Sequence, residues 1–102
     1  MGRKVFSVTL KKDRPEQRWG FGITGGKDVG LTIRIEKVSP SSPASAAGLH
    51  NLDYLVKVGN QEVFDMNHNE VVSMVRSAGS QLDIVVERYG LLCNETYTAA
   101  AS

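Results

Sequence analysis

Residues 18–26 read Arg18-Trp19-Gly20-Phe21-Gly22-Ile23-Thr24-Gly25-Gly26, an aromatic residue followed by glycines that alternate with apolar or small residues. Glycine lacks a Cβ atom, so its backbone adopts positive φ easily and its N–H group can be approached closely. Successive N–H groups in such a turn form a concave site for an anion. Phe21 and Ile23 then alternate with Gly22 and Thr24, which predicts a strand. An anion site that leads into a strand suits the carboxylate at the end of a peptide better than a nucleotide phosphate.

Three of these glycines, Gly20, Gly22 and Gly25, also match the spacing G-x-G-x-x-G of dinucleotide-binding proteins. That motif requires a helix directly after the glycines, because the helix N-terminus binds the pyrophosphate. Here residues 32–38 follow, and their alternating side chains predict another strand. Because no helix follows the glycines, their spacing alone does not indicate a nucleotide-binding site.

The composition is that of one globular domain of 102 residues, with 41% hydrophobic and 23% charged residues. The 12 basic and 11 acidic residues nearly cancel, which argues against a surface for nucleic acid or anionic membranes. The single cysteine, Cys93, excludes an intrachain disulfide and favours a reducing compartment. We therefore expect a cytoplasmic protein with a folded domain over residues 1–90 and a tail or linker over residues 91–102.

The sequence carries no pattern typical of catalysis or metal binding. Two histidines, one cysteine and scattered acidic residues show no metal-ligand spacing. No G-x-S-x-G motif occurs, and nothing indicates a general base beside a nucleophile. We expect no enzymatic activity and no cofactor.

The periodicity of the apolar residues predicts six strands and one longer helix, and Pro43 and Gly48 mark the start and the end of a second, short helix. The strands cover residues 5–10, 21–24, 32–38, 54–58, 61–63 and 81–88, and the helices cover residues 44–47 and a segment from Asn67 to Ala78-Gly79. Asn67 is a favoured N-cap, and Glu70 three residues later completes a capping-box pattern. The order β-β-β-α-β-β-α-β indicates a mostly β fold with two helices (α+β), a partly open antiparallel sandwich of five to six strands.

A groove is expected if the strand at residues 21–24 lies beside the helix that begins at Asn67. An unpaired strand edge there accepts an added peptide strand, and alternate side chains of that peptide give specificity. His68, Val72 and Val75 share one helix face at i, i+4 and i+7, and His68 is placed to reach a hydroxyl group of the peptide. The apolar pocket for the last side chain would be lined by Trp19, Phe21, Ile23, Val72 and Val75.

Several motifs, in this order along the chain, resemble those of the PDZ domain family. The first is Arg18-Trp19-Gly20-Phe21, which is similar to the family's Gly-Leu-Gly-Phe loop, and the glycine pair Gly25-Gly26 follows it. The segment Ser42-Pro43-Ala44-Ser45-Ala46-Ala47-Gly48-Leu49 is similar to the short first helix of the family and the residues that leave it. The last is Leu55-Val56-Lys57-Val58-Gly59-Asn60, which is similar to the family's Ile-x-x-Val-Asn-Gly strand and turn. The resemblance covers residues 5–88. Arg18 departs from the family, because it stands where the loop has its first glycine.

The resemblance implies how a carboxylate would be bound. The backbone N–H groups of Trp19, Gly20 and Phe21 would donate hydrogen bonds to the terminal carboxylate of a peptide. Arg14, in the preceding loop, would assist through water.

The resemblance also implies how the rest of the peptide would be recognised. The peptide would pair with the strand from Phe21 through Gly22 and Ile23 to Thr24. His68 would contact a Ser or Thr two residues before the peptide end. The implied ligands are C-termini of other proteins of the class Ser/Thr-x-apolar-COOH.

A finer similarity is to the PDZ domains of PDZ-LIM proteins, which are actin-cytoskeleton adaptors that bind α-actinin. It rests on Trp19-Gly20-Phe21, on the position near the chain start and on the pattern Val63-Phe64-x-Met66-x-His68. It implies a monomeric scaffold or adaptor that is associated with the cytoskeleton or lies beneath the plasma membrane. The alternative is a domain that self-associates or binds an internal motif through its strand edges, without capture of a carboxylate.

Overall fold

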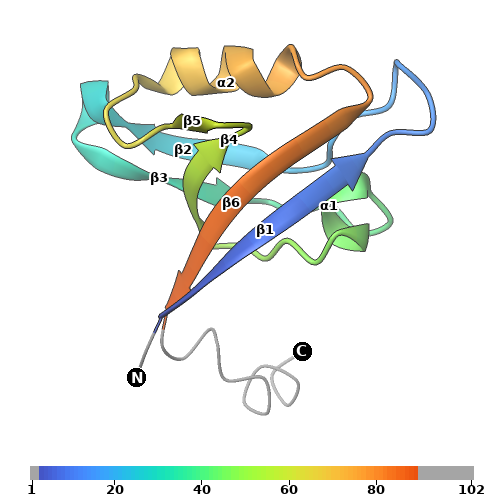
Figure 1. Ribbon diagram of the computed structural model, residues 1–102, viewed down its shortest axis with the longest axis horizontal. Coiled ribbons are helices and arrows are strands. Elements are labelled where there is room, and N and C mark those ends of the chain that lie inside the picture. The colour runs from blue at the N-terminus through green and yellow to red at the C-terminus, as the bar shows by residue number, and fades with distance from the viewer. Residues whose placement is uncertain (1–2, 90–102) are drawn as a thin grey trace.

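A computed structural model describes residues 3–89 of the chain. The elements are β1 (Arg3–Lys11), β2 (Gly22–Gly26), the 3-10 turn η1 (Lys27–Val29), β3 (Leu31–Glu36), α1 (Pro43–Ala46), β4 (Tyr54–Val58), β5 (Gln61–Glu62), α2 (His68–Arg76) and β6 (Gln81–Tyr89) (Figure 1). This order confirms the predicted succession of strands and helices, with one 3-10 turn added between β2 and β3. The predicted tail at residues 91–102, with Cys93, lies outside the described residues.

The six strands form one antiparallel sheet in the order β1-β6-β4-β3-β2, and β5 pairs with β4. β1 and β6 pair over their full length, from Arg3 opposite Tyr89 to Lys11 opposite Gln81. β2 is the last strand of the sheet and pairs only with β3. Its other edge is therefore not covered by a strand, and α2 runs alongside it (Figure 1).

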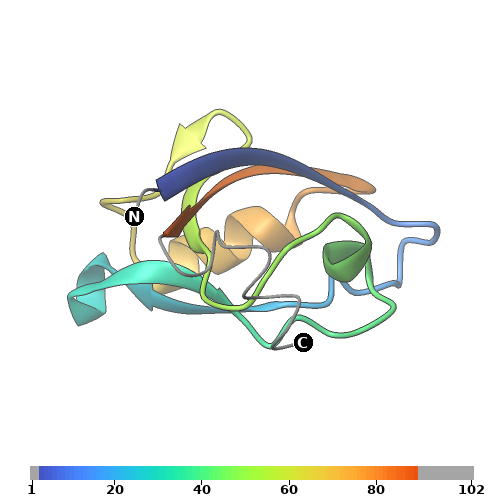
Figure 2. The same ribbon diagram turned by 90° about the horizontal axis from the view of Figure 1, so that it is seen from below.

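The core lies between the sheet layers and α2. The residues of β6 alternate between buried and more exposed positions, with Leu82, Ile84 and Val86 buried as the period of two predicts. α2 contributes Val71 and Val75 to the same apolar cluster. Figure 2 shows α2 between the layer of β1 and β6 and the layer of β2 and β3. The helix therefore closes the sandwich on the side where β2 has no strand neighbour.

Some element ends differ from the predicted ones because of local backbone geometry. The third strand ends at Glu36, not at Val38, because Lys37 adopts a left-handed φ of 56°. β2 extends to Gly26 through a bulge after Thr24, which the positive φ of two successive glycines permits. Periodicity alone does not indicate either feature.

The start of α2 agrees with the capping-box prediction. The backbone N–H of Asn67 donates to Glu70 Oε1 at 2.9 Å, and the Asn67 side chain accepts from the backbone N–H of Glu70. These bonds satisfy amide donors that have no partner within the helix. They fix His68 as the first residue of α2.

A buried ion pair joins β6 to the chain segment after α1. The Arg88 guanidinium donates to Asp53 Oδ1 at 2.7 Å and Oδ2 at 2.8 Å, and also to the Gly48 carbonyl at 3.2 Å. Asp53 is completely buried and accepts a further hydrogen bond, at 3.0 Å, from the His50 amide. The pair therefore anchors the exit of α1 to the core.

We expect Arg88→Met to lower the free energy of unfolding by about 3–5 kcal/mol, because it leaves the Asp53 carboxylate buried without its partner. The matched control is Arg34→Met, which breaks the partly exposed pair between Arg34 and Glu36, 3.2 Å apart. A pair of that kind contributes about 0–1 kcal/mol. Urea denaturation measures both variants, and equal losses would contradict the anchoring role of Arg88.

Candidate functional site

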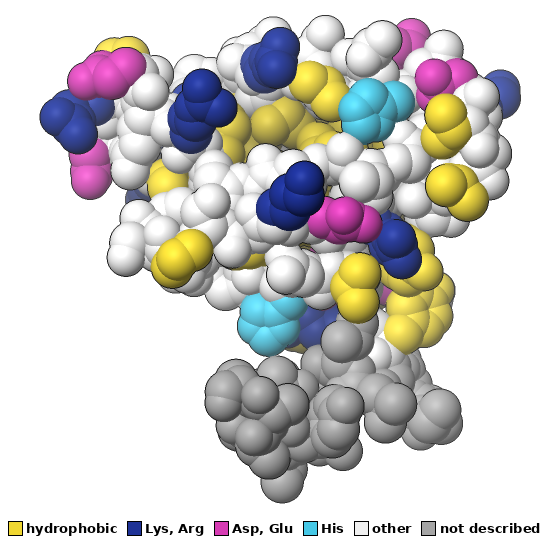
Figure 3. Space-filling model, turned by 180° about the vertical axis from the view of Figure 1, so that it is seen from behind, with side chains coloured by type: hydrophobic (Ala, Val, Ile, Leu, Met, Phe, Trp, Pro, Cys, Tyr) yellow, Lys and Arg dark blue, Asp and Glu magenta, His cyan; other side chains and the backbone are white. Residues whose placement is uncertain are grey.

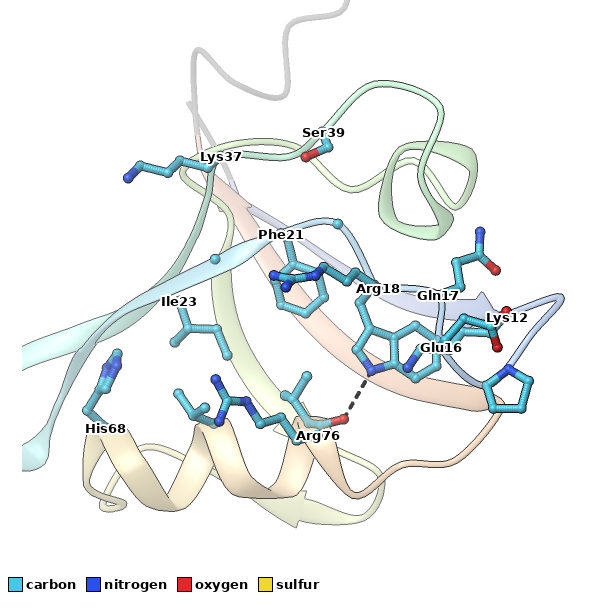
Figure 4. Close-up of a pocket in the computed structure, with 16 residues that line it drawn as sticks. Lys12, Glu16, Gln17, Arg18, Phe21, Ile23, Lys37, Ser39, His68 and Arg76 are labelled. Atoms are coloured by element: carbon cyan, nitrogen blue, oxygen red, sulfur yellow. Dashed lines mark hydrogen bonds between the residues drawn. The ribbon is translucent and has the colours of Figure 1, made fainter.

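A groove of about 820 Å³ lies between β2 and α2. Figure 3 shows apolar side chains in a hollow, with Lys and Arg side chains along its rim and a histidine at one end. Figure 4 shows Phe21 and Ile23 facing α2 from the β2 side, and His68 rising from the start of α2. The groove is thus bounded by the strand and helix that the sequence predicts to be neighbours.

In the loop at residues 18–21, two carbonyl groups are paired within the protein and three amide groups are free. The Trp19 carbonyl accepts from Ala44 N at 2.9 Å, and the Gly20 carbonyl accepts from Ser39 N at 2.7 Å. Within residues 3–89, the N–H groups of Trp19, Gly20 and Phe21 donate to no protein acceptor. All three residues line the groove, so a set of unsatisfied donors lies at the end of β2.

The shape of this loop requires glycine at one position. Gly20 has a φ of 93°, and a Cβ atom added there would lie 2.2 Å from the Cβ of Ser42. Ser42 is the N-cap of α1, and its hydroxyl accepts from Ser45 N at 3.2 Å. Close packing of α1 against the backbone of Gly20 therefore sets the loop conformation.

The indole of Trp19 joins the loop to α2. Its Nε1–H donates to the Val75 carbonyl at 3.1 Å (Figure 4), and the side chain is only 7% exposed. Lys12 Nζ lies 4.3 Å from the centre of the ring. Trp19 and Val75 contribute to the groove from the core side, so they form its floor more than its walls.

The apolar walls come from two elements. Phe21 and Ile23 are half-buried on the β2 side, and Val72 is half-buried on the α2 side. With Trp19 and Val75, they are the five residues that the sequence predicts for the pocket, and the structure brings all five together. Such a lining suits an aliphatic or aromatic side chain.

His68 lies at the opposite end of the groove, with a fixed ring orientation. Its Nδ1 is 2.9 Å from the Gly25 carbonyl oxygen, and its backbone N–H donates to Asp28 Oδ1 at 3.0 Å. A carbonyl oxygen only accepts hydrogen bonds, so Nδ1 must carry a proton. In the neutral ring, Nε2 is then an acceptor.

Residues 7–87 match the family profile of the PDZ domain. The chain belongs to the PDZ domain family. The family resemblance inferred from the loop and helix motifs is thereby confirmed, and the protein is a protein-interaction module.

Relatives of this PDZ domain include proteins that combine PDZ and LIM domains. The chain is 28% identical to PDZ and LIM domain protein 7 of Xenopus laevis over 89 residues, 87% of this chain and 20% of that protein. It is 34% identical to the PDZ and LIM domain protein Zasp of Drosophila melanogaster over 74 residues, 72% of this chain and 3% of that protein. It is 30% identical to LIM domain-binding protein 3 of Mus musculus, over 81% of this chain and 11% of that protein. The chain thus spans a fifth or less of the length of these relatives.

Two predicted site residues do not face the groove of the PDZ domain. Arg14 is 76% exposed, pairs with Glu16 at 3.7 Å and does not line the groove. The Thr24 side chain lies on the other face of β2, where its hydroxyl donates to Glu36 Oε2 at 3.2 Å. The alternation of a strand accounts for Thr24, since Ile23 beside it faces the groove.

Four basic residues that line the groove were not predicted as site residues. Arg76 and Lys37 line the groove together with Lys12 and Arg18 (Figure 4). Arg76 could have been found, because it continues the i, i+4 series of His68 and Val72 along α2. Lys37 could not, because its position depends on the left-handed turn after β3.

No helix within residues 3–89 is both long and apolar enough to span a bilayer. No group of three or more His, Cys, Asp or Glu side chains in that range is arranged to hold a metal ion.

We expect Gly20→Ala to destabilise the PDZ domain by about 2–4 kcal/mol, because the new methyl group combines backbone strain with overlap at Ser42. Gly22→Ala is the matched control. Gly22 has no positive φ, and an added Cβ would meet its nearest neighbour, Glu36 O, at 3.5 Å. The free energy of unfolding of the Gly22→Ala variant should stay within about 0.5 kcal/mol of that of the wild type. Denaturation curves compare the two, and equal stability of both variants would refute the packing constraint on the loop.

We expect the neutral His68 ring to carry its proton on Nδ1. Two-bond ¹H–¹⁵N correlation spectra at a pH of about 8.5 distinguish the two ring nitrogens, with His68→Ala used to assign the signals. A proton found on Nε2 would show that the ring presents a donor to the groove, contrary to the orientation described above.

Proposed function

We propose that this PDZ domain binds the C-terminal ends of other proteins, of the class Ser/Thr-x-apolar-COOH, by strand addition to β2. The observation that carries this proposal is the set of unpaired N–H groups of Trp19, Gly20 and Phe21 at the end of an uncovered strand edge. Backbone donors in such an arrangement suit a carboxylate. A catalytic role has no support from the residues that line the groove.

The register of β2 sets how a peptide would pair. The carbonyl of Gly20 accepts from Ser39 N. Ile35 lies opposite Ile23, but its N–H and C=O groups bond to Asp53 and Leu52, on the side away from β2. In an antiparallel sheet, successive residues direct their backbone groups to opposite edges. The N–H and C=O groups of Phe21 and Ile23 therefore point to the uncovered edge. The last residue of the peptide would lie beside Phe21 and the third-last beside Ile23.

This register supports the proposed ligand class. The side chain of the last residue would enter the apolar pocket between Phe21, Ile23 and Val72, where burial of an aliphatic side chain contributes about 1.5–3 kcal/mol. The third-last side chain would point to the same side and reach the His68 end. A Ser or Thr hydroxyl there donates to His68 Nε2, which the bond of Nδ1 to Gly25 leaves as an acceptor.

The charge at the groove suits an anionic peptide end. Lys12, Arg18, Lys37 and Arg76 line it, whereas its acidic lining is limited to Glu16 in the described part of the chain. A local excess of positive charge raises the association rate of an anion. We assign this role to Arg18 and Arg76 in place of Arg14, which does not line the groove and pairs with Glu16.

At the level of the cell, we propose a cytoplasmic adaptor or scaffold associated with the cytoskeleton. The support is the similarity to proteins named for their PDZ and LIM domains. By the same resemblance, the C-termini of α-actinin-like proteins are candidate partners.

The test is fluorescence-polarisation binding to a library of peptides ending in Ser/Thr-x-apolar, each as the free acid and as the C-terminal amide. We expect the best acids to bind with a Kd near 1 μM, about −8 kcal/mol, and the amides to bind at least tenfold more weakly. Equal binding of acid and amide would favour recognition of an internal motif. Absence of binding, together with a mass that rises with concentration in light scattering, would favour self-association.

We expect His68→Ala to weaken peptides with Thr as the third-last residue by about 1–2 kcal/mol, because the hydroxyl then lacks its acceptor. Peptides with Ala at that place should bind the wild type and the variant equally. The matched control is His50→Ala, since His50 is the other histidine and does not line the groove. If the wild type bound Thr and Ala peptides with equal affinity, His68 would have no part in recognition.

A further inference from the structure

Two Ser-Pro dipeptides, Ser39-Pro40 and Ser42-Pro43, occur between the end of β3 and the start of α1. Ser39 is exposed in a segment without helix or strand, and within residues 3–89 its hydroxyl forms no hydrogen bond. The Ser42 hydroxyl, in contrast, donates to the Ser39 carbonyl at 2.6 Å and accepts from Ser45 N at 3.2 Å. Of the two serines, Ser39 is therefore the one that another enzyme can reach.

Ser39 lies beside the free amide groups of the loop. Its backbone N–H donates to the Gly20 carbonyl at 2.7 Å. That carbonyl and the free N–H of Phe21 belong to one trans peptide unit, so they point in opposite directions. The backbone nitrogen atoms of Ser39 and Phe21 are thus about 5 Å apart. Ser39 also lines the groove (Figure 4), so a group attached to its hydroxyl lies close to the place proposed for the peptide carboxylate.

A single phosphate would change the charge of the groove substantially. Within residues 3–89, four basic side chains and one acidic side chain line it, an excess of three positive charges with His68 neutral. A phosphoserine carries about −1.5 to −2 charges at neutral pH and has three strong acceptor oxygens. It would offset at least half of this excess and pair with the cations that attract a carboxylate. It would also repel the carboxylate directly, since the Debye length at physiological ionic strength is about 8 Å.

We propose that Ser39 is a phosphorylation site for proline-directed protein kinases and that its modification weakens the binding of peptide C-termini. Kinases of this class recognise a serine followed directly by a proline, which Ser39-Pro40 provides. The kinase transfers the γ-phosphoryl group of ATP, so that the bond from Ser39 Oγ to phosphorus forms and the bond from that phosphorus to the β–γ bridging oxygen breaks. The hydroxyl proton passes to the catalytic base of the kinase, and ADP leaves. The effect on binding rests on the proposed function, whereas the modification itself does not.

The first experiment tests the site. The chain is treated with purified mitogen-activated or cyclin-dependent kinases and MgATP, and the phosphate is located by mass spectrometry of proteolytic peptides. We expect phosphate on Ser39 and none on Ser42, and we expect Ser39→Ala to abolish the modification. Phosphate on Ser42 in place of Ser39, or on neither serine, overturns the assignment.

The second experiment tests the effect on binding, with the tightest-binding acid from the peptide library. We expect phosphorylation of Ser39 to raise the Kd at least tenfold in about 50 mM salt. In about 500 mM salt the increase should fall below threefold, because the Debye length there is only about 4 Å. Ser39→Glu and Ser39→Gln are the matched pair, since the two side chains are similar in size and differ in charge. Ser39→Glu should bind at least threefold more weakly than Ser39→Gln in the lower salt.

The outcomes separate this inference from the proposed function. If phosphorylation leaves the Kd unchanged while acids still bind more tightly than amides, control by Ser39 is overturned and carboxylate capture stands. Equal Kd values of Ser39→Glu and Ser39→Gln, or an increase that is the same in both salts, overturn the electrostatic cause. If the unmodified chain binds no acid, or binds acids and amides equally, the proposed function fails and the control of binding fails with it. The masses still decide whether Ser39 is modified.

Discussion

The hydrogen bond from the Trp19 indole to the Val75 carbonyl is the interaction on which the groove depends most. β2 has a strand neighbour on one side only, so the sheet alone does not fix its distance from α2. The indole fixes that distance at one end, and the contacts of His68 with Gly25 and Asp28 fix it at the other. β2 and α2 are not joined by backbone pairing of strands, so the side chains of Trp19 and His68 set the distance between them. The pocket forms between these two points of attachment.

The loop that carries the free amides is supported from behind by α1. Ala44 N bonds the Trp19 carbonyl, and Ser42 packs against Gly20 so closely that no Cβ fits between them. α1 is itself anchored at its exit, where the Gly48 carbonyl accepts from Arg88. A short helix of four residues has little stability of its own. The buried Asp53–Arg88 pair therefore affects the binding site, because it fixes the element against which the loop is shaped.

Local patterns predicted most of the fold, and long-range contacts account for what they did not predict. The alternation of Leu82, Ile84 and Val86 and the capping box at Asn67 depend on near neighbours, so both could be predicted from the sequence. The i, i+4, i+7 series of α2 likewise predicted one wall of the pocket. The hydrogen bond between His68 and Gly25 joins residues 43 apart in sequence, and no local pattern indicates it. Arg14 was assigned from the position of its loop, but the direction of an exposed side chain depends on partners such as Glu16.

Arg18 shows how the loop accommodates a departure from the family pattern. A glycine at this place would allow positive φ, but positive φ in the loop is needed at Gly20, and Arg18 does not have it. The substitution therefore adds no backbone strain of this kind. It places a guanidinium at the rim of the groove that Phe21 also lines, and the amide of Phe21 is one of the free donors. Free amides orient a carboxylate by short, directional bonds, whereas the cation attracts it over a longer range. Under the proposed function, the glycine lost from the pattern is replaced by a charge that would attract the same carboxylate, and the positive φ that the loop needs is supplied by Gly20.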